Sequence, residues 1–148
     1  MTNQRTDAYS GNSIEGRTRL HTQILKAVRR EVGQDYPIAI RFGAYEENEN
    51  GAKSEEAPLA AKLFEEAGAD LIDVSGGLSG YIRKDITDAG YFRNESALIR
   101  KNVNIPVLTA GGVETRQQAE DLLNTYDLDL IGVARAILKD SKWPEKNL

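Results

Sequence analysis

The stretch Asp70-Leu71-Ile72-Asp73-Val74-Ser75-Gly76 is a nearly continuous apolar run that follows a helical pattern and ends in small residues. A similar stretch, Asp129-Leu130-Ile131-Gly132-Val133-Ala134-Arg135, follows another helical pattern. Two further apolar runs cover 37–42 and 105–109. Continuous rather than alternating apolar runs are typical of parallel strands buried on both faces of a sheet. The sequence therefore predicts an α/β fold with four parallel strands.

Helical patterns precede the first of these runs and follow each of the four. The first helix is expected over 14–32, where apolar residues recur at helical spacing and are expected to face the core. These residues are Leu20, Ile24, Ala27, Val28 and Val32. Ser54 and Asn94 are expected to cap the second and third helices. Thr115 and Gln118 have the spacing of a capping box at the start of the fourth.

The length of the chain leaves two arrangements open. A complete (β/α)₈ TIM barrel takes roughly 250 residues, so four strand–helix units in 148 residues correspond to a half-barrel. A self-contained, flavodoxin-like sheet of four or five strands would fit the same length with nothing missing. Both arrangements alternate strands with helices, so the pattern alone does not separate them.

The composition indicates a single globular domain, with 40% hydrophobic and 28% charged residues. A net charge of −4 argues against a dedicated nucleic-acid surface. The chain has no cysteine, which excludes disulfides and thiolate metal sites, and its one histidine, His21, is expected to be structural. No apolar run reaches the roughly 20 residues that span a bilayer. Residues 1–7 have no secretory pattern. We therefore expect no membrane association and a cytoplasmic location.

The clearest candidate site is the turn Thr109-Ala110-Gly111-Gly112-Val113, which joins a predicted strand to a capped helix. Two glycines allow backbone N–H groups to approach a ligand closely, and a helix N-terminus favours an anion. The next strand ends at Ala134-Arg135, which adds a cation beside a second expected helix start. Barrel phosphate sites are typically built from two adjacent turns of this kind. The alternative is a tight turn that needs glycine only for its backbone shape.

Two other features belong to the same predicted sheet edge. Arg41 lies inside an apolar strand, where it is expected either to pair with a carboxylate such as Asp73 or to contact a ligand. The long loop over 76–92 has a length typical of binding loops. It carries Tyr81 and Tyr91, whose rings could stack on a planar ligand, although ordinary packing is the simpler interpretation.

Several stretches resemble the Old Yellow Enzyme family of FMN-dependent NAD(P)H oxidoreductases and ene-reductases. The N-terminal stretch Asn3-x-Arg5-Thr6-Asp7-x-Tyr9-Ser10-Gly11-x-Ser13-x-Glu15-x-Arg17 is similar to the family pattern N-x-R-x-D-x-Y-G-G-S-x-E-N-R. The similarity continues through Pro37-Ile38-Ala39-Ile40-Arg41, the glycine turn and the run at 129–135, in order and at compatible spacing. It covers nearly the whole chain.

The resemblance implies that the four strands are the fifth to eighth of a (β/α)₈ barrel with FMN at their carboxyl ends. Arg41 would match the arginine at the pyrimidine edge of the flavin, where a positive charge stabilises the reduced, anionic ring. The phosphate-binding turns would be matched by Gly111 and Gly112 together with Ala134 and Arg135. The reductant would be NADH or NADPH, and the acceptor an electron-poor small molecule.

The resemblance also has departures. The usual glycine before the phosphate arginine is Ala134, which restricts the backbone of that turn. The residues with which the family anchors and protonates its substrate would precede Met1, so no catalytic residue is assigned and little activity is expected of the chain alone. Unpaired strand edges would favour a homodimer or a complementary half-barrel. An inactive fragment is the remaining alternative.

Overall fold

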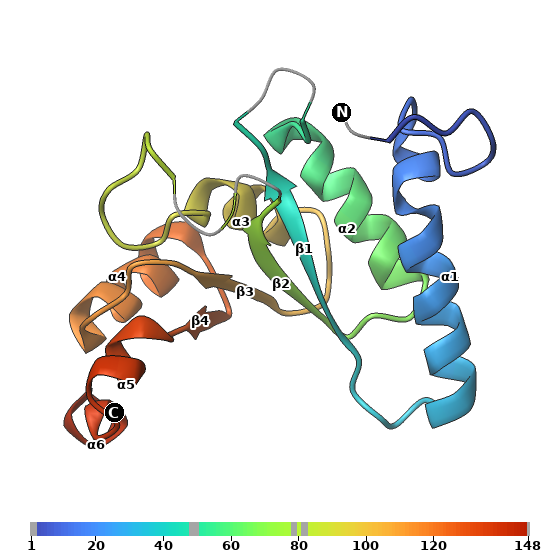
Figure 1. Ribbon diagram of the computed structural model, residues 1–148. Helices are drawn as coiled ribbons and strands as arrows, with labels where there is room; N and C mark the ends of the chain where they lie inside the picture. Colours follow the sequence, from blue (N-terminus) through green and yellow to red (C-terminus); the bar gives the residue numbers. More distant parts are fainter. Residues whose placement is uncertain (1–2, 48–50, 78–79, 81–82, 148) are drawn as a thin grey trace.

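The computed structural model describes residues 3–47, 51–77, 80 and 83–147, and Figure 1 shows the arrangement of their helices and strands. The elements in chain order are α1 (Ile14–Val32), β1 (Ala39–Tyr45), η1 (Ser54–Glu56), α2 (Ala57–Glu66), β2 (Leu71–Gly76), α3 (Arg93–Arg100), β3 (Val107–Ala110), α4 (Arg116–Tyr126), β4 (Leu130–Gly132), α5 (Arg135–Lys139) and α6 (Trp143–Asn147). None of these helices is long and apolar enough to cross a bilayer.

The four strands form one parallel sheet in the order β1-β2-β3-β4. Consecutive helices pack against one another, α1 on α2, α2 on α3 and α3 on α4. In Figure 1, α1 and α2 lie side by side, and α5 and α6 lie at the other end of the molecule. A doubly wound sheet reverses its strand order at a switch point and carries helices on both faces. The flavodoxin-like alternative is therefore wrong, and the sheet has the sequential topology of a barrel fragment.

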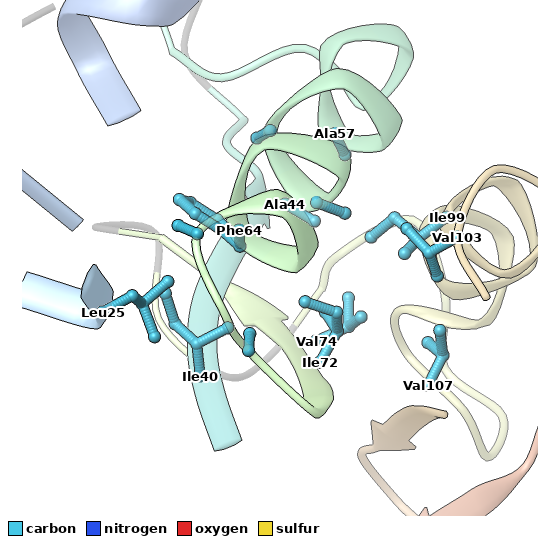
Figure 2. Packing of buried hydrophobic residues seen from close by; sticks show 14 of the residues in the cluster. Leu25, Ile40, Ala44, Ala57, Phe64, Ile72, Val74, Ile99, Val103 and Val107 are labelled. Atoms are coloured by element: carbon cyan, nitrogen blue, oxygen red, sulfur yellow. The ribbon is translucent and has the colours of Figure 1, made fainter. Parts of the chain in front are cut away.

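The core lies between the helices and one face of the sheet. Alternate strand residues point into it, because successive side chains of a strand face opposite sides. Ile40 and Ala44 come from β1, Ile72 and Val74 from β2, and Val107 from β3. Figure 2 shows these residues beside Phe64, Ile99 and Val103.

Among the described residues, no helix covers the opposite face of the sheet. Arg41, Asp73, Leu108 and Leu130 occupy the intervening strand positions, and all four are partly or largely accessible. Leu130, on the edge strand β4, keeps 42% of its surface exposed. The expectation of a sheet buried on both faces is therefore wrong for this chain. A closed barrel would enclose this second face.

Of the caps expected at Ser54, Asn94 and Thr115, one is confirmed and two are wrong. The capping box of α4 is confirmed, because the Thr115 hydroxyl accepts from the Gln118 amide and the Gln118 side chain accepts from the Thr115 amide. Ser54 instead begins the short 3₁₀ helix η1, and its hydroxyl donates to Glu95 at 2.8 Å. Asn94 lies inside α3, whose N-cap residue is Phe92. At Ser54, the contact with Glu95 of α3 takes the place of the expected cap.

The apolar stripe expected to bury α1 is mostly exposed. Leu20 and Ile24 keep 55% and 53% of their surface accessible, and Val28 and Val32 each keep 39%. The helix instead buries Leu25 and Arg29 against its neighbours. The Arg29 guanidinium donates to the carbonyls of Gly33, Tyr36 and Gly68 and pairs with Asp70. This buried arginine joins the end of α1 to the start of β2, whereas the stripe faces away from the core.

Candidate functional site

An open cavity of about 730 Å³ lies at the carboxyl ends of the strands. It is lined by all five residues that the sequence singled out, namely Arg41, Gly111, Gly112, Ala134 and Arg135. Arg41 comes from β1, the glycines from the turn after β3, and the last two residues from the junction of β4 and α5. The parallel topology explains why these residues lie in one cavity, because the carboxyl ends of parallel strands share one edge of the sheet.

Arg41 forms an ion pair on the open face of the sheet. Its Nη1 lies 2.8 Å from Asp73 Oδ2, and its Nη2 donates to Ser75 Oγ at 3.1 Å. Arg41 and Asp73 are register partners in β1 and β2, so their side chains emerge side by side. The arginine is not buried as expected, since its side chain is 55% exposed. The predicted pairing with Asp73 is confirmed, and the guanidinium remains accessible from the cavity.

The glycine turn has a backbone that other residues rarely adopt. Gly111 has φ +116° and Gly112 has φ +71°. A Cβ atom at either position would also stand too close to the Tyr91 ring, at 2.7 Å and 2.9 Å respectively. Two independent constraints, the positive φ and the neighbouring ring, therefore require glycine at both positions.

Arg135 enters the cavity from the opposite edge of the sheet. Its Nη2 donates to the Tyr91 hydroxyl at 2.9 Å, and its guanidinium carbon lies 5.6 Å from the centre of that ring. Ala134 has φ −124°, which lies outside the left-handed region that favours glycine. The backbone of this turn therefore does not require glycine for a positive φ.

The expected contribution of two helix N-termini stays a prediction. Helix α4 begins at Arg116, beyond the glycine turn, and the Gln118 side chain of its capping box accepts from the amides of Glu114 and Thr115. Helix α5 begins at Arg135 and has only five residues. The Arg135 side chain adds a cation to the same cavity.

The other candidate residues have separate roles. Tyr91 belongs to the cavity wall, whereas Tyr81 lies outside the described residues. The His21 ring packs on Phe64 with ring centres 5.6 Å apart, as expected of a structural histidine. Among the residues that the structure describes, no group of three or more metal-binding side chains is found.

A buried ion pair between the loop before α3 and the first turn of α3 was not predicted. Arg83 and Glu95 have side chains that are 7% and 3% exposed, and Arg83 Nη1 donates to Glu95 Oε1 at 2.7 Å. Arg83 also donates to Asp85, which raises the pKa of the guanidinium above its usual range and lowers the pKa of the Asp85 carboxyl. The Arg83 guanidinium stacks on Tyr45, 3.7 Å from the ring centre. The sequence shows Arg83 in a loop and Glu95 at the start of an expected helix, and nothing in their spacing indicates burial.

Similar proteins agree with the fold. The chain is 36% identical to an NADH oxidase of Thermoanaerobacter brockii over 98% of its length, and 35% identical to an NADPH dehydrogenase of Halalkalibacterium halodurans over 99%. It spans 23% and 42% of those relatives. The solved structure of a 2-naphthoyl-CoA reductase complex superposes on 99% of the chain with a TM-score of 0.80 at 25% identity, and the chain covers 23% of it.

The chain therefore corresponds to a part of longer proteins. The four-stranded parallel sheet and its helices are a fragment of the (β/α) barrel of such flavoenzymes. The family model for NADH:flavin oxidoreductases and NADH oxidases matches residues 1–147. By this match the chain belongs to the NADH:flavin oxidoreductase / NADH oxidase family.

Proposed function

We propose that this chain carries the carboxyl half of an FMN site in an NAD(P)H-dependent oxidoreductase of the Old Yellow Enzyme type. In the complete protein, bound FMN would accept a hydride from NADH or NADPH and pass it to an electron-poor acceptor. Residues 1–148 would form a single domain, the carboxyl-terminal half of the barrel. The cytoplasmic location expected from the sequence stays a prediction.

The cavity supports this proposal by its size and its charges. Its volume of about 730 Å³ falls within the range of cofactor sites. Arg41 and Arg135 bring one guanidinium from each edge of the sheet into the same cavity. Arg135 and the Gly111–Gly112 turn would hold the phosphate, and Arg41 would face the pyrimidine edge of the flavin ring. This placement of two cations at the two edges is the observation that carries the proposal.

The side chains have defined tasks in this proposal. Arg135 would bind the phosphate as a fixed cation, while the glycines allow a close approach of the backbone. Arg41, oriented by Asp73 and Ser75, would stabilise negative charge on the reduced ring. We assign no proton-donating or substrate-anchoring residue within 1–148, and we expect the chain alone to have little reductase activity.

Titration with FMN tests the proposal directly. The wild-type chain is expected to bind FMN, and Arg135→Ala is expected to weaken binding by about tenfold or more, because it removes a charge-assisted contact. Gly112→Val is expected to weaken binding as well, since it combines φ +71° with a clash against Tyr91. Arg116→Ala is a matched control, because Arg116 pairs with Glu120 on an exposed helix face and does not line the cavity.

The outcomes separate the remaining alternatives. If the wild type binds FMN and neither cavity variant changes the affinity, the flavin site lies elsewhere on the chain. If the wild type binds no FMN, the chain is an inactive fragment. Flavin fluorescence quenching is a suitable readout, and circular dichroism of each variant verifies that the fold is retained.

A further inference from the structure

Tyr91 holds a central position in the cavity that the flavin proposal leaves without a role. It follows Gly90, whose amide donates to the Gly111 carbonyl at 2.6 Å, so the loop is fastened to the glycine turn. The Tyr91 ring lies against both glycines of that turn and also packs on the hydrophobic core. These contacts fix the ring, and the ring determines where the hydroxyl points.

The Tyr91 hydroxyl can still donate one hydrogen bond. It accepts from Arg135 Nη2 at 2.9 Å. In the part of the chain that the structure describes, no acceptor is found for the hydroxyl's own proton. A phenol oxygen that accepts from a cation becomes a stronger O–H donor, because hydrogen bonds in a chain polarise one another. The proton is therefore available to an anion that enters the cavity.

We propose that Tyr91 is a phosphate-binding residue of this cavity, with its hydroxyl donating to an oxygen of a phosphate monoester that Arg135 binds at the same time. A tetrahedral phosphate has several acceptor oxygens and is bound best by donors from different directions. Arg135 comes from the end of β4, and Tyr91 comes from the loop before α3. The inference rests on the proposed function where it identifies the monoester as that of FMN.

The Tyr91 ring has a second part in this arrangement. It fills the space over Gly111 and Gly112 where side chains would otherwise stand, and it thereby closes one side of the phosphate position. The alternative is that the Tyr91 hydroxyl blocks the Arg135 guanidinium, so that Tyr91 must move away before a phosphate can bind. The two possibilities predict opposite effects of removing the hydroxyl, so one substitution distinguishes them.

The decisive variant is Tyr91→Phe, which keeps the ring on the glycines and removes only the hydroxyl. We expect FMN to bind about five- to tenfold more weakly, as for the loss of one hydrogen bond to a charged group. Riboflavin has the same ring system without the phosphate, and its affinity is expected to stay unchanged. Tyr126→Phe is the matched control, since Tyr126 lies beside Arg93 and does not line the cavity.

Three outcomes would overturn the inference. An equal loss for FMN and riboflavin would assign Tyr91 to ring packing alone. An unchanged FMN affinity would remove Tyr91 from the site. A tighter FMN complex would show that Tyr91 competes with the phosphate for Arg135.

A titration with inorganic phosphate tests the role of Tyr91 without any flavin. Phosphate is expected to shift the backbone amide resonance of Gly112 in the wild-type chain, and Tyr91→Phe is expected to require several-fold more phosphate for the same shift. If this holds while FMN fails to bind, the flavin proposal fails and the phosphate role of Tyr91 stands. If phosphate leaves the wild-type spectrum unchanged, the inference is wrong.

Discussion

Arg41 and Arg135 are the two cations of the cavity, and their surroundings differ. Arg41 is oriented by two neighbouring side chains on β2, Asp73 and Ser75. Asp73 also has a buried oxygen, Oδ1, without a hydrogen-bond partner among the described residues. Arg135 instead contacts an aromatic hydroxyl and ring. Arg41 is thus held by a carboxylate, whereas Arg135 is held by Tyr91, a side chain that can itself donate to an anion.

The charge of Arg41 leads to a prediction about the bound flavin. Arg41→Gln keeps a hydrogen-bond donor and removes the positive charge, so the reduced, anionic flavin loses stabilisation. We expect the midpoint potential of bound FMN to fall by about 30–60 mV, which corresponds to a charged hydrogen bond in a two-electron couple. Potentiometric titration of the chain reconstituted with FMN measures this midpoint potential. Arg116→Gln, on an exposed face, should leave the potential unchanged, and an equal shift in both variants would contradict the assignment.

At the scale of elements, the loop between β2 and α3 is fastened by a buried ion pair. Arg83 belongs to the loop and Glu95 to the first turn of α3, and Ser54 of η1 donates to the same Glu95 carboxylate. The later part of this loop contributes Thr87, Asp88, Ala89, Tyr91 and Phe92 to the lining of the cavity. The pair therefore positions the segment that presents Tyr91 to the glycine turn.

Removal of one partner of this pair is expected to be costly. Glu95→Gln leaves the Arg83 charge buried with a weaker partner, and we expect the free energy of unfolding to fall by about 3 kcal/mol. Glu120→Gln is the control, since the pair of Glu120 with Arg116 is exposed and should change stability by less than about 1 kcal/mol. Urea denaturation followed by circular dichroism measures both. Equal, small losses would show that the buried pair does not hold the loop.

The sequence predicted best those features that depend on neighbours along the chain. The strands, the capping box at Thr115 and the glycine turn are local patterns, and each appears in the structure. The cap expected at Asn94 failed because α3 begins one residue earlier, with Phe92 as its N-cap residue, and the burial expected of Arg41 failed because its face of the sheet is open. In the sequence, Tyr91 is an aromatic loop residue whose ring could stack on a planar ligand. Its role depends on how the loop folds back on the β3–α4 turn, and no spacing in the sequence encodes that contact.

At the scale of the whole molecule, the structure leaves surfaces that a complete barrel would cover. Strands β1 and β4 each pair on one side only, so the described sheet has two open edges. The stripe formed by Leu20, Ile24, Val28 and Val32 lies on α1, next to the β1 edge, and Leu130 is exposed at the β4 edge. Unpaired edges and apolar patches of this kind are typical of interfaces. The sequence indicated an open half-barrel, but it did not show that the α1 stripe faces outward.

These surfaces predict that the isolated chain associates. Covering several hundred Å² of apolar surface at about 25 cal/mol per Å² contributes on the order of 10 kcal/mol before the costs of association, and a charge of −4 opposes pairing only weakly at physiological salt. We therefore expect a homodimer, or larger aggregates, in sedimentation velocity at micromolar concentration. Ile24→Glu places a charge on the α1 stripe and should shift the chain towards monomer without loss of helix, because Ile24 is already exposed. Gln23→Glu adds the same charge one position away and is expected to leave the association unchanged. A well-folded wild-type monomer that binds no hydrophobic dye would contradict the half-barrel interpretation of these surfaces.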